Sequence, residues 1–439
     1  MKEMPSIVVL GASGLIGQAV AQHLLASGLK TTSVARRFTK AQKNAFGADG
    51  VECPFATLQP SELVRVLGDA DVVVNCVGIL QDGPKGRTDD VHIVFVERLL
   101  RAIEIRARSG LLVHLSIPGT EAEDETSFSR TKRRADRSIE DGPNPHVIIR
   151  PGFVIAPTAY GGSALVRAIA SMPFDLPQRD RARPFSTTDI ADVAVTVELV
   201  ARRWSQGHAG LRADWDILDS RSVTLGDVVD RFRHHFGGPK PWVSLPVWAM
   251  SVGARLGDAA AWLGWSPPIR TTALREMRRG VSGDPSHWIA DTGLTPSTLE
   301  QALMRCMGSV QETWFSRLYL LKPLIIASLA VFWAVSGLVA LFPSFDAATR
   351  ILIDHGFPDD IAIVVTVLSS LTDIAVGLAI AFRRTCRIGL IAGMAVSFFY
   401  MVGAAVITPD MWIEPLGALI KTGPAIILML VALATFDDR

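Results

Sequence analysis

Four apolar segments of helix length fill the last quarter of this 439-residue chain. They cover residues 323–342, 361–382, 388–407 and 416–436. Each is close to the roughly 20 residues that an α-helix needs to cross a hydrocarbon core about 30 Å thick. The sequence therefore predicts an all-α four-helix transmembrane bundle over residues 317–439, preceded by a water-soluble part. Buried core helices of a large soluble protein are the alternative.

Arginines mark one side of this bundle. Arg383, Arg384 and Arg387 lie in the short connection between the second and third segments, whereas the loops at residues 343–360 and 408–415 are acidic or neutral. Positively charged loops stay on the cytoplasmic side of a membrane. We therefore expect a multi-pass protein of the cell inner membrane with both termini cytoplasmic. Residues 1–6 show no signal-peptide pattern, so we expect the N-terminal part to remain in the cytoplasm.

Length and composition narrow the functional classes. A chain of 439 residues is long enough for two or three domains, and we expect two. The formal net charge is +1, and no basic run with interleaved aromatic residues occurs, so we exclude nucleic acid as a partner. The four cysteines are scattered without C-x-x-C spacing, which argues against a disulfide framework and against a metal site.

A strand, a glycine-rich turn and a helix open the chain. Residues 7–10 are wholly apolar, and an amphipathic helix ends near Ser27. The turn between them consists of Gly11, Ala12, Ser13, Gly14, Leu15, Ile16 and Gly17. Glycines let such a turn approach a pyrophosphate, and the helix N-terminus offers unpaired N–H groups and a partial positive charge. The motif predicts a dinucleotide site, the alternative being an ordinary tight turn.

Two arginines follow the second predicted strand, residues 31–35. An acidic residue at this place would bind the ribose hydroxyls of NAD, whereas arginine accommodates the 2′-phosphate of NADP. Arg36 and Arg37 therefore favour NADP(H) over NAD(H) as the cofactor. A solvated basic loop is the alternative.

Strands and helices then alternate. Apolar strands are expected at residues 72–76, 111–116 and 146–150, and helices at residues 63–67, 91–107 and 128–140. This alternation predicts an α/β, Rossmann-like doubly wound parallel sheet with helices on both faces.

These residues resemble the atypical branch of the short-chain dehydrogenase/reductase (SDR) superfamily. The likeness is strongest to the group that contains the nucleotide-binding accessory subunit of respiratory complex I and other NAD(P)-binding epimerase-like proteins. It covers roughly residues 5–300, which we take as one domain, residues 1–316, with a small lobe at about 151–316. The resemblance implies a set of cofactor-binding residues: Gly11, Ser13, Gly14, Leu15, Ile16, Gly17, Arg36, Arg37, Asn75, Val77, Gly78, Lys132, Pro151 and Val154.

One position departs from the SDR pattern. The family's catalytic pair is Tyr-x-x-x-Lys, and here Phe128 stands four residues before Lys132. The resemblance implies catalytic roles for Ser116 and Lys132, but the phenol that transfers the proton is missing. General acid–base groups of this kind contribute about 10² to 10⁴ in rate. The substitutes that the sequence offers are Ser116, His114, Ser127 and Ser129. The acid that the family carries after its third strand is also replaced, by Phe55, Ala56 and Thr57.

The small lobe contains a tryptophan-rich helix, expected at residues 247–265. Trp248, Trp262 and Trp265 suit a membrane interface, where an apolar ring with a polar edge is stable. A core helix of the small lobe is the equal alternative.

Two charged residues lie inside the apolar segments. Asp373 is in the second segment and Lys421 in the fourth, and a charge at mid-bilayer usually faces the bundle interior with a partner. The two could pair as a structural link, or they could form a polar site for a quinone, lipid head group or proton. With Pro415, Leu416, Gly417 and Pro424, the four segments resemble the DoxX-like membrane family, which implies a link to redox processes.

The sequence thus predicts a membrane-anchored, NAD(P)H-binding, atypical SDR-like protein, an oxidoreductase for a lipid-soluble substrate of the quinone or isoprenoid type. The alternative is a non-catalytic NADP(H)-binding assembly or sensor protein of a membrane redox complex. The replacement of tyrosine by Phe128 leaves the choice between enzyme and non-enzyme open.

Overall fold

The computed structural model describes residues 4–83, 86–106, 109–208, 210–413 and 419–436. The chain forms two compact units, one of residues 1–258 and 268–316 and the other of residues 259–267 and 317–439. The second unit thus includes a short segment that the sequence had placed in the small lobe.

Seven parallel strands form the main sheet of the first unit, in the order β10-β6-β5-β4-β1-β2-β3. They are β1 (Ser6–Leu10), β2 (Lys30–Ala35), β3 (Gly50–Glu52), β4 (Val72–Asn75), β5 (Leu111–Leu115), β6 (His146–Pro151) and β10 (Arg212–Ile217). The predicted doubly wound parallel sheet is confirmed. The strand order reverses between β1 and β4, and ligands of such sheets bind at the carboxyl ends of the strands near this point.

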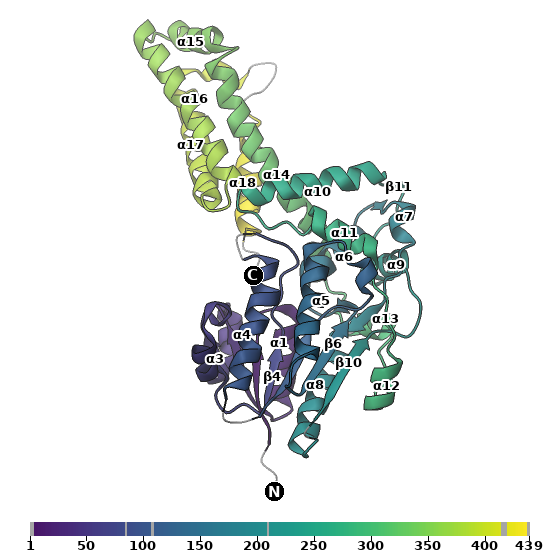
Figure 1. Cartoon of the computed structure of the whole chain (residues 1–439). Helices are drawn as coiled ribbons and strands as arrows, with labels where there is room; N and C mark the ends of the chain where they lie inside the picture. Colours follow the sequence, from purple (N-terminus) through teal and green to yellow (C-terminus); the bar gives the residue numbers. More distant parts are fainter. Residues whose placement is uncertain (1–3, 84–85, 107–108, 209, 414–418, 437–439) are drawn as a thin grey trace. The chain divides into compact units, whose positions relative to one another are not determined.

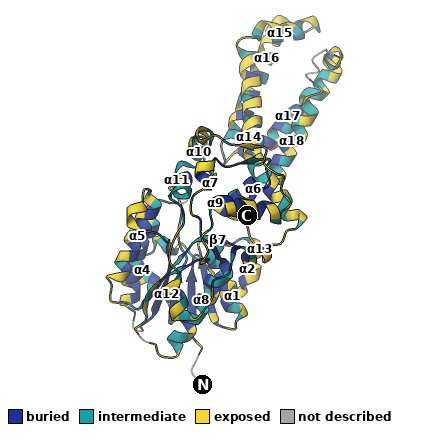
Figure 2. Ribbon diagram, turned by 90° about the vertical axis from the view of Figure 1, so that its right-hand side faces the viewer, coloured by how far each residue is buried: buried dark blue, intermediate teal, exposed yellow. Residues whose placement is uncertain are grey.

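Helices cover both faces of the sheet, because successive side chains of a strand point to opposite faces. Ile7 and Val9 pack with the helices on one face, and Val8 and Leu10 with those on the other. The first group is α1 (Leu15–Ala26), α8 (Ile190–Ser205) and α12 (Ser286–Thr292), and the second is α3 (Pro60–Leu67), α4 (Phe95–Glu104) and α5 (Ser127–Glu140). Figure 2 shows the strands of this sheet buried between the two helical layers.

The helix expected at residues 91–107 differs in detail. A π-helical turn, Asp90–Val94, precedes α4, and residue 107 lies outside the described residues. The short α2 (Lys40–Phe46) follows β2 and begins at a capping box formed by Thr39 and Gln42.

The small lobe has its own apolar core. Its helices are α6 (Gly161–Ala170), α7 (Gln178–Arg181), α9 (Leu225–His235), α10 (Val247–Trp262), α11 (Thr271–Arg279) and α13 (Leu299–Met304). Two small parallel sheets join it, one of β7 (Phe153–Ile155) with β9 (Thr187–Asp189) and one of β8 (Phe174–Asp175) with β11 (Val243–Ser244).

The second unit consists of apolar helices, labelled in Figure 1. They are α14 (Val310–Leu341), which begins in the first unit, α15 (Phe345–Asp354), α16 (Asp359–Ala381), α17 (Cys386–Ile407) and α18 (Thr422–Ala434). Among the described residues, α14, α16 and α17 are long and apolar enough to cross a membrane. Many of their large apolar side chains are exposed, as expected for helices that face lipid.

Three expectations for this unit need correction. The helix containing the first segment begins at Val310 rather than at residue 323, and Pro323 lies inside it. The loop expected at residues 343–360 contains the helix α15. The fourth segment is described only as the 13-residue α18, about 20 Å long at 1.5 Å per residue, which is shorter than a standard span. The fragment with Pro415, Leu416 and Gly417 lies outside the described residues.

Candidate functional site

The glycine turn after β1 has the geometry that a bound pyrophosphate requires. Gly11 has φ +83°, and a Cβ there would lie 3.1 Å from the backbone carbonyl of Cys76. A Cβ on Gly17 would lie 2.3 Å from the carbonyl oxygen of Gly11. Gly14 is the N-cap of α1 and offers no side-chain cap, so the first-turn N–H groups of this helix point to a ligand position. These residues fit a dinucleotide.

The carboxyl end of β2 carries Arg36 and Arg37, and both side chains are exposed. Sequence analysis missed an acid whose charge interacts with Arg37. Glu52, the last residue of β3, accepts a 2.6 Å hydrogen bond from the amide of Phe38 and pairs with Lys43 at 2.9 Å. These contacts lower the pKa of Glu52, with the Phe38 amide contributing most. Glu52 therefore fixes the loop that carries the arginines.

At the end of β4, Asn75 shapes the loop that follows. Its Oδ1 accepts a hydrogen bond from the amide of Val77 (3.1 Å), and its Nδ2 lies 3.0 Å from Nδ1 of His114. Asn75 is fully buried, whereas Gly78 is exposed. Of the cofactor residues that the resemblance implies here, Asn75 is therefore a buried support. Val77 and Gly78 form a loop that can face a ligand.

Lys132 reaches the same loop from α5. Its Nζ donates a 2.7 Å hydrogen bond to the carbonyl of Leu115 and lies 3.5 Å from the place that a Cβ on Gly78 would occupy. Burial lowers the pKa of Lys132 to about 8, although the charge of Asp136 opposes the shift. The structure therefore brings Lys132 and Gly78 together.

Phe128 lies one helical turn before Lys132 and contacts the ring of His92. The sequence analysis did not single out this histidine. The rings of Phe128 and His92 meet edge to face, with centroids 5.6 Å apart. His92 accepts a 3.1 Å hydrogen bond from the amide of Ile79, and its Nδ1 lies 2.8 Å from Oγ1 of Thr131. Burial lowers the pKa of His92 to about 2. A neutral histidine with both nitrogens engaged does not replace the phenol as an acid.

Ser116 is directed to an acid that sequence analysis also missed. Its Oγ donates a 2.8 Å hydrogen bond to Oδ2 of Asp136, which also accepts a 3.3 Å hydrogen bond from Nε of Arg150. Burial raises the pKa of Asp136, although Ser116 and Arg150 oppose the shift. The signal was available, because Asp136 follows Lys132 by one helical turn and therefore lies on the same buried face of α5.

The other suggested substitutes are placed differently. His114 is fully buried beside Asn75, and burial holds its pKa well below the usual value. Ser129 donates a 3.0 Å hydrogen bond to Glu276, and Ser127 is exposed at the start of α5. Neither His114 nor Ser129 is available as an acid in this arrangement.

Helix α11 of the small lobe closes over the loop after β5. Besides Ser129, Glu276 accepts a hydrogen bond from Thr126, the N-cap of α5. Arg279 donates a 2.8 Å hydrogen bond to the carbonyl of Pro118 and pairs with Asp124 at 3.3 Å. The helix that carries Phe128 and Lys132 is thus fixed by the small lobe at its first turn.

The segment expected at the nicotinamide end continues from β6. Pro151 is buried, Val154 is half-buried in β7, and Gly152 donates a 2.7 Å hydrogen bond to Oγ1 of Thr188. A Cβ on Gly152 would lie 2.5 Å from the carbonyl oxygen of Ser186. This close approach holds β7 against β9 at the base of the small lobe.

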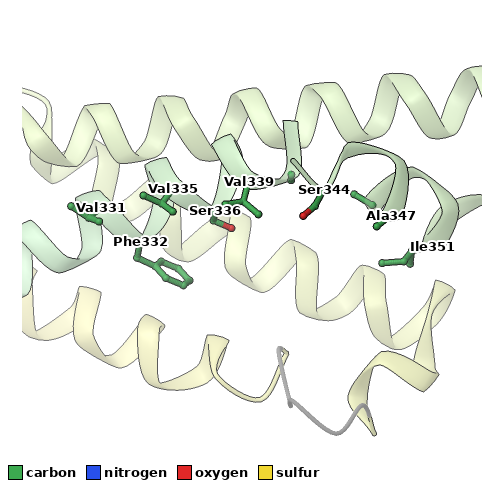
Figure 3. Close-up of a pocket in the computed structure, with 10 residues that line it drawn as sticks. Val331, Phe332, Val335, Ser336, Val339, Ser344, Ala347 and Ile351 are labelled. Carbon is green, nitrogen blue, oxygen red and sulfur yellow. The ribbon is translucent and has the colours of Figure 1, made fainter. Parts of the chain in front are cut away.

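Asp373 and Lys421 are both described, and they do not form the pair that the sequence suggested. Asp373 is buried and accepts a 2.9 Å hydrogen bond from the hydroxyl of Tyr400, with Ser336 as a second hydrogen-bond partner. Lys421 is the exposed N-cap residue of α18. Ser336 also lines an apolar recess of about 650 Å³ between α14 and α15, shown in Figure 3. The polar contacts of Asp373 are therefore with hydroxyl groups of α14 and α17.

Two families match the two parts of the chain. An NAD(P)H-binding family matches residues 11–197, and the DoxX-like family matches residues 330–430. The sequence is 28% identical over 183 residues to dTDP-6-deoxy-L-talose 4-dehydrogenase (NAD(P)(+)) of Kitasatospora kifunensis. That match covers 36% of this chain and 55% of the relative, so it spans about half of the relative's length.

Solved structures show the same fold as the first part. WbmH of Bordetella bronchiseptica in complex with NAD+ is similar with a TM-score of 0.51 and 15% identity, over 69% of this chain and 97% of that one. The human epimerase family protein SDR39U1 with NADPH has a TM-score of 0.51 and 18% identity, over 68% of this chain and 97% of its own. At these identities the likeness concerns the fold alone.

Proposed function

We propose that this protein transfers reducing equivalents from NADPH to a lipid-soluble acceptor. Its chain joins an NAD(P)-binding Rossmann domain of the epimerase-like SDR type to a DoxX-like membrane domain. The observation that carries the proposal is that the glycine turn, Lys132 and Ser116 all lie at the carboxyl ends of the central strands, in a protein with apolar helices long enough to cross a membrane. The anchor would concentrate the site where lipid-soluble molecules lie.

The choice of NADP(H) is supported by Arg36 and Arg37, which follow β2 and are exposed. Guanidinium groups bind phosphate through charge-assisted hydrogen bonds. The first turn of α1 would hold the pyrophosphate, and Lys132 would donate to the nicotinamide ribose. Bound NADPH would supply a hydride.

The acceptor class follows from the missing phenol. A carbonyl that takes a hydride needs a proton at its oxygen, and Phe128 supplies none, while His92 is held neutral. A quinone that takes a hydride becomes a hydroquinone anion, which can collect its proton from water. Ser116 would orient the acceptor oxygen by turning its hydroxyl proton from Asp136 to that oxygen. We therefore propose a quinone-type acceptor.

A second candidate is a non-catalytic NADP(H)-binding assembly or sensor protein of a membrane redox complex. It is favoured by Phe128 and by the hydrogen bond that directs Ser116 to Asp136. In that case the nucleotide would bind tightly and no acceptor would be reduced.

The deciding experiment measures NADPH oxidation by the full chain in mild detergent, with short-chain quinones and with aldehydes as acceptors. We expect turnover with quinones, loss of that turnover in Ser116→Ala, and no change in the control Ser138→Ala, whose hydroxyl donates a 3.1 Å hydrogen bond to the carbonyl of Arg134. Tight nucleotide binding without any turnover would select the non-catalytic candidate.

A companion variant tests the missing tyrosine. Phe128→Tyr places a phenol one helical turn before Lys132, where an ammonium group lowers the pKa of the phenol. We expect aldehyde reduction to rise by about 10² or more, and Lys132→Ala in the same background to abolish the gain. An inert Phe128→Tyr, beside an active wild type, would show that this position plays no part in the reaction.

A further inference from the structure

Helix α10 exposes an almost wholly apolar face. Its outward side chains are Trp248, Val252, Leu256 and Trp262, with 69%, 43%, 66% and 91% of their surface exposed. These positions recur at the spacing that places them on one side of a helix. The opposite side is buried: Met250, Ala254 and Gly257 face inward, and Met250 and Ala254 belong to the apolar core of the small lobe. Trp248 and Trp262 are therefore not core residues.

The chain just before α10, which includes strand β11, also exposes large apolar side chains. Trp242, which precedes the strand, and Val243 are 82% and 52% exposed. Large aromatic and aliphatic side chains in such density rarely face water on a soluble surface. This α10 face, residues 242–262, therefore needs an explanation.

Arg255 lies in the middle of the apolar face. It is exposed, and no ion pair with an acidic residue is found for it within the described part of the chain. Amphipathic helices that lie in a membrane interface combine tryptophan and leucine on the apolar side with basic residues that reach the phosphates. Arginine buries its methylene stem along apolar surface and keeps its charge in the polar layer.

The end of α10 leads into the membrane-embedded unit. The carbonyl of Leu263 accepts a 3.0 Å hydrogen bond from the amide of Arg383, and Nε1 of Trp265 donates a 2.7 Å hydrogen bond to the carbonyl of Ala381. Arg383 also lies over the Trp265 ring, 5.3 Å from its centroid. Both contacts are made at the turn where α16 ends and α17 begins, which is the boundary of the apolar layer. The chain that follows α10 is thus fixed to the turn between the apolar helices α16 and α17.

We propose that the exposed face of α10 lies in the headgroup layer of an anionic bilayer, with its tryptophans at the acyl boundary and Arg255 on lipid phosphate. This surface would bind lipid in addition to the spanning helices. The proposal does not depend on the proposed oxidoreductase activity. The surface would hold the small lobe, and with it the loop after β5, close to lipid.

The test uses a photo-crosslinking amino acid, benzoylphenylalanine, in the full chain reconstituted in nanodiscs of phosphatidylcholine and phosphatidylglycerol. It replaces Trp248 in one variant and Leu256 in another, and the matched control replaces Ser61, an exposed residue of α3. NADPH binding by each variant reports that the first unit is folded. Mass spectrometry of the illuminated protein identifies the adducts.

We expect lipid adducts at positions 248 and 256 and none at position 61. Phosphatidylglycerol should be enriched over its bulk share at position 256 by about fivefold, because a basic residue near an anionic surface gains about 1 kcal/mol, and Arg255→Gln should remove the enrichment. Crosslinks to a second copy of the chain would assign the face to a dimer. Folded variants without lipid adducts would overturn the proposal, whatever the outcome of the quinone assays.

Discussion

At the scale of single residues, burial decides which side chains of the nucleotide-binding unit carry charge. Four titratable side chains of this unit are buried: those of Lys132, His92, His114 and Asp136. Burial disfavours the charged form, so the pKa values of the lysine and the two histidines fall and that of the aspartate rises. For Lys132 the lowered pKa, about 8, lies near neutrality.

The specificity for the 2′-phosphate rests on Arg36 and Arg37. Each charge-assisted hydrogen bond to phosphate is worth about 1.5 to 3 kcal/mol. Replacing both arginines by alanine should weaken NADPH binding at least about tenfold and leave NADH nearly unchanged, as measured by calorimetry. Lys30→Ala removes a charge from the opposite end of β2 and should change neither affinity. Equal losses for both nucleotides would contradict the assignment.

The charge of Lys132 should make nucleotide binding depend on pH. Because its pKa in the folded protein is lowered to about 8, the ammonium form is present below that pH and is lost as the pH rises through it. We expect NADH to bind roughly threefold more tightly at pH 7 than at pH 9, since the ammonium group attracts the nucleotide phosphates. Lys132→Met should bind weakly at both pH values, and the exposed Lys240→Met should behave as the wild type. A pH-independent wild type would show that Lys132 does not face the cofactor.

At the scale of elements, the apolar helices pack through glycines. A Cβ on Gly337 of α14 would lie 2.4 Å from the carbonyl oxygen of Ser370, and one on Gly377 of α16 would lie 2.5 Å from the amide nitrogen of Ala334. Gly389 makes a similar approach to the amide nitrogen of Ile380, at 2.7 Å. Small residues let membrane helices approach closely, where packing rather than the hydrophobic effect drives association.

Gly377→Ala should therefore separate α14 from α16. We expect overpacking to cost about 1 to 3 kcal/mol in the free energy of unfolding, measured by thermal unfolding in mild detergent. The control is Gly403→Ala in α17, where a Cβ meets nothing within 4 Å and should be neutral or slightly stabilising. A stable Gly377→Ala would mean that the two helices adjust without loss.

The sequence predicted the elements whose signal is local. Alternation of apolar strands with helices identified the sheet, and the glycine turn identified the ligand end of β1. Hydropathy marked the first membrane segment only from Pro323, because the preceding turns of α14 carry polar residues such as Glu312. The partner of Asp373 could not be predicted, because its contact with Tyr400 depends on the relative rotation of two helices. Asp136 and Glu276 were missed because each acts on another side chain.

At the scale of the whole molecule, the two ends of the membrane-embedded unit differ in charge. At one end, Arg383 lies 3.9 Å from the ring centroid of Phe436, and Nζ of Lys322 donates a 3.1 Å hydrogen bond to the carbonyl of Phe436. At the other end, His355 lies 2.8 Å from Asp410. The chain therefore passes from one end to the other between Asp410 and Phe436, although the described part of that passage, α18, is short for a span.

This arrangement makes the membrane orientation testable with single cysteines. Because positive loops stay inside, the end with Arg383 and Phe436 should face the cytoplasm and the end with His355 the outside. In a background in which the four native cysteines are replaced by serine, a membrane-impermeant maleimide applied to intact cells should label Asp354→Cys, whereas Arg384→Cys should react only after permeabilisation. A reporter fused after Arg439 should show cytoplasmic activity, because the last described residue lies beside the arginine turn. An external reporter, together with labelling of Asp354→Cys from outside, would contradict this orientation. The chain after Asp410 would then not cross the bilayer, and α18 would end on the same side of the membrane as Asp410.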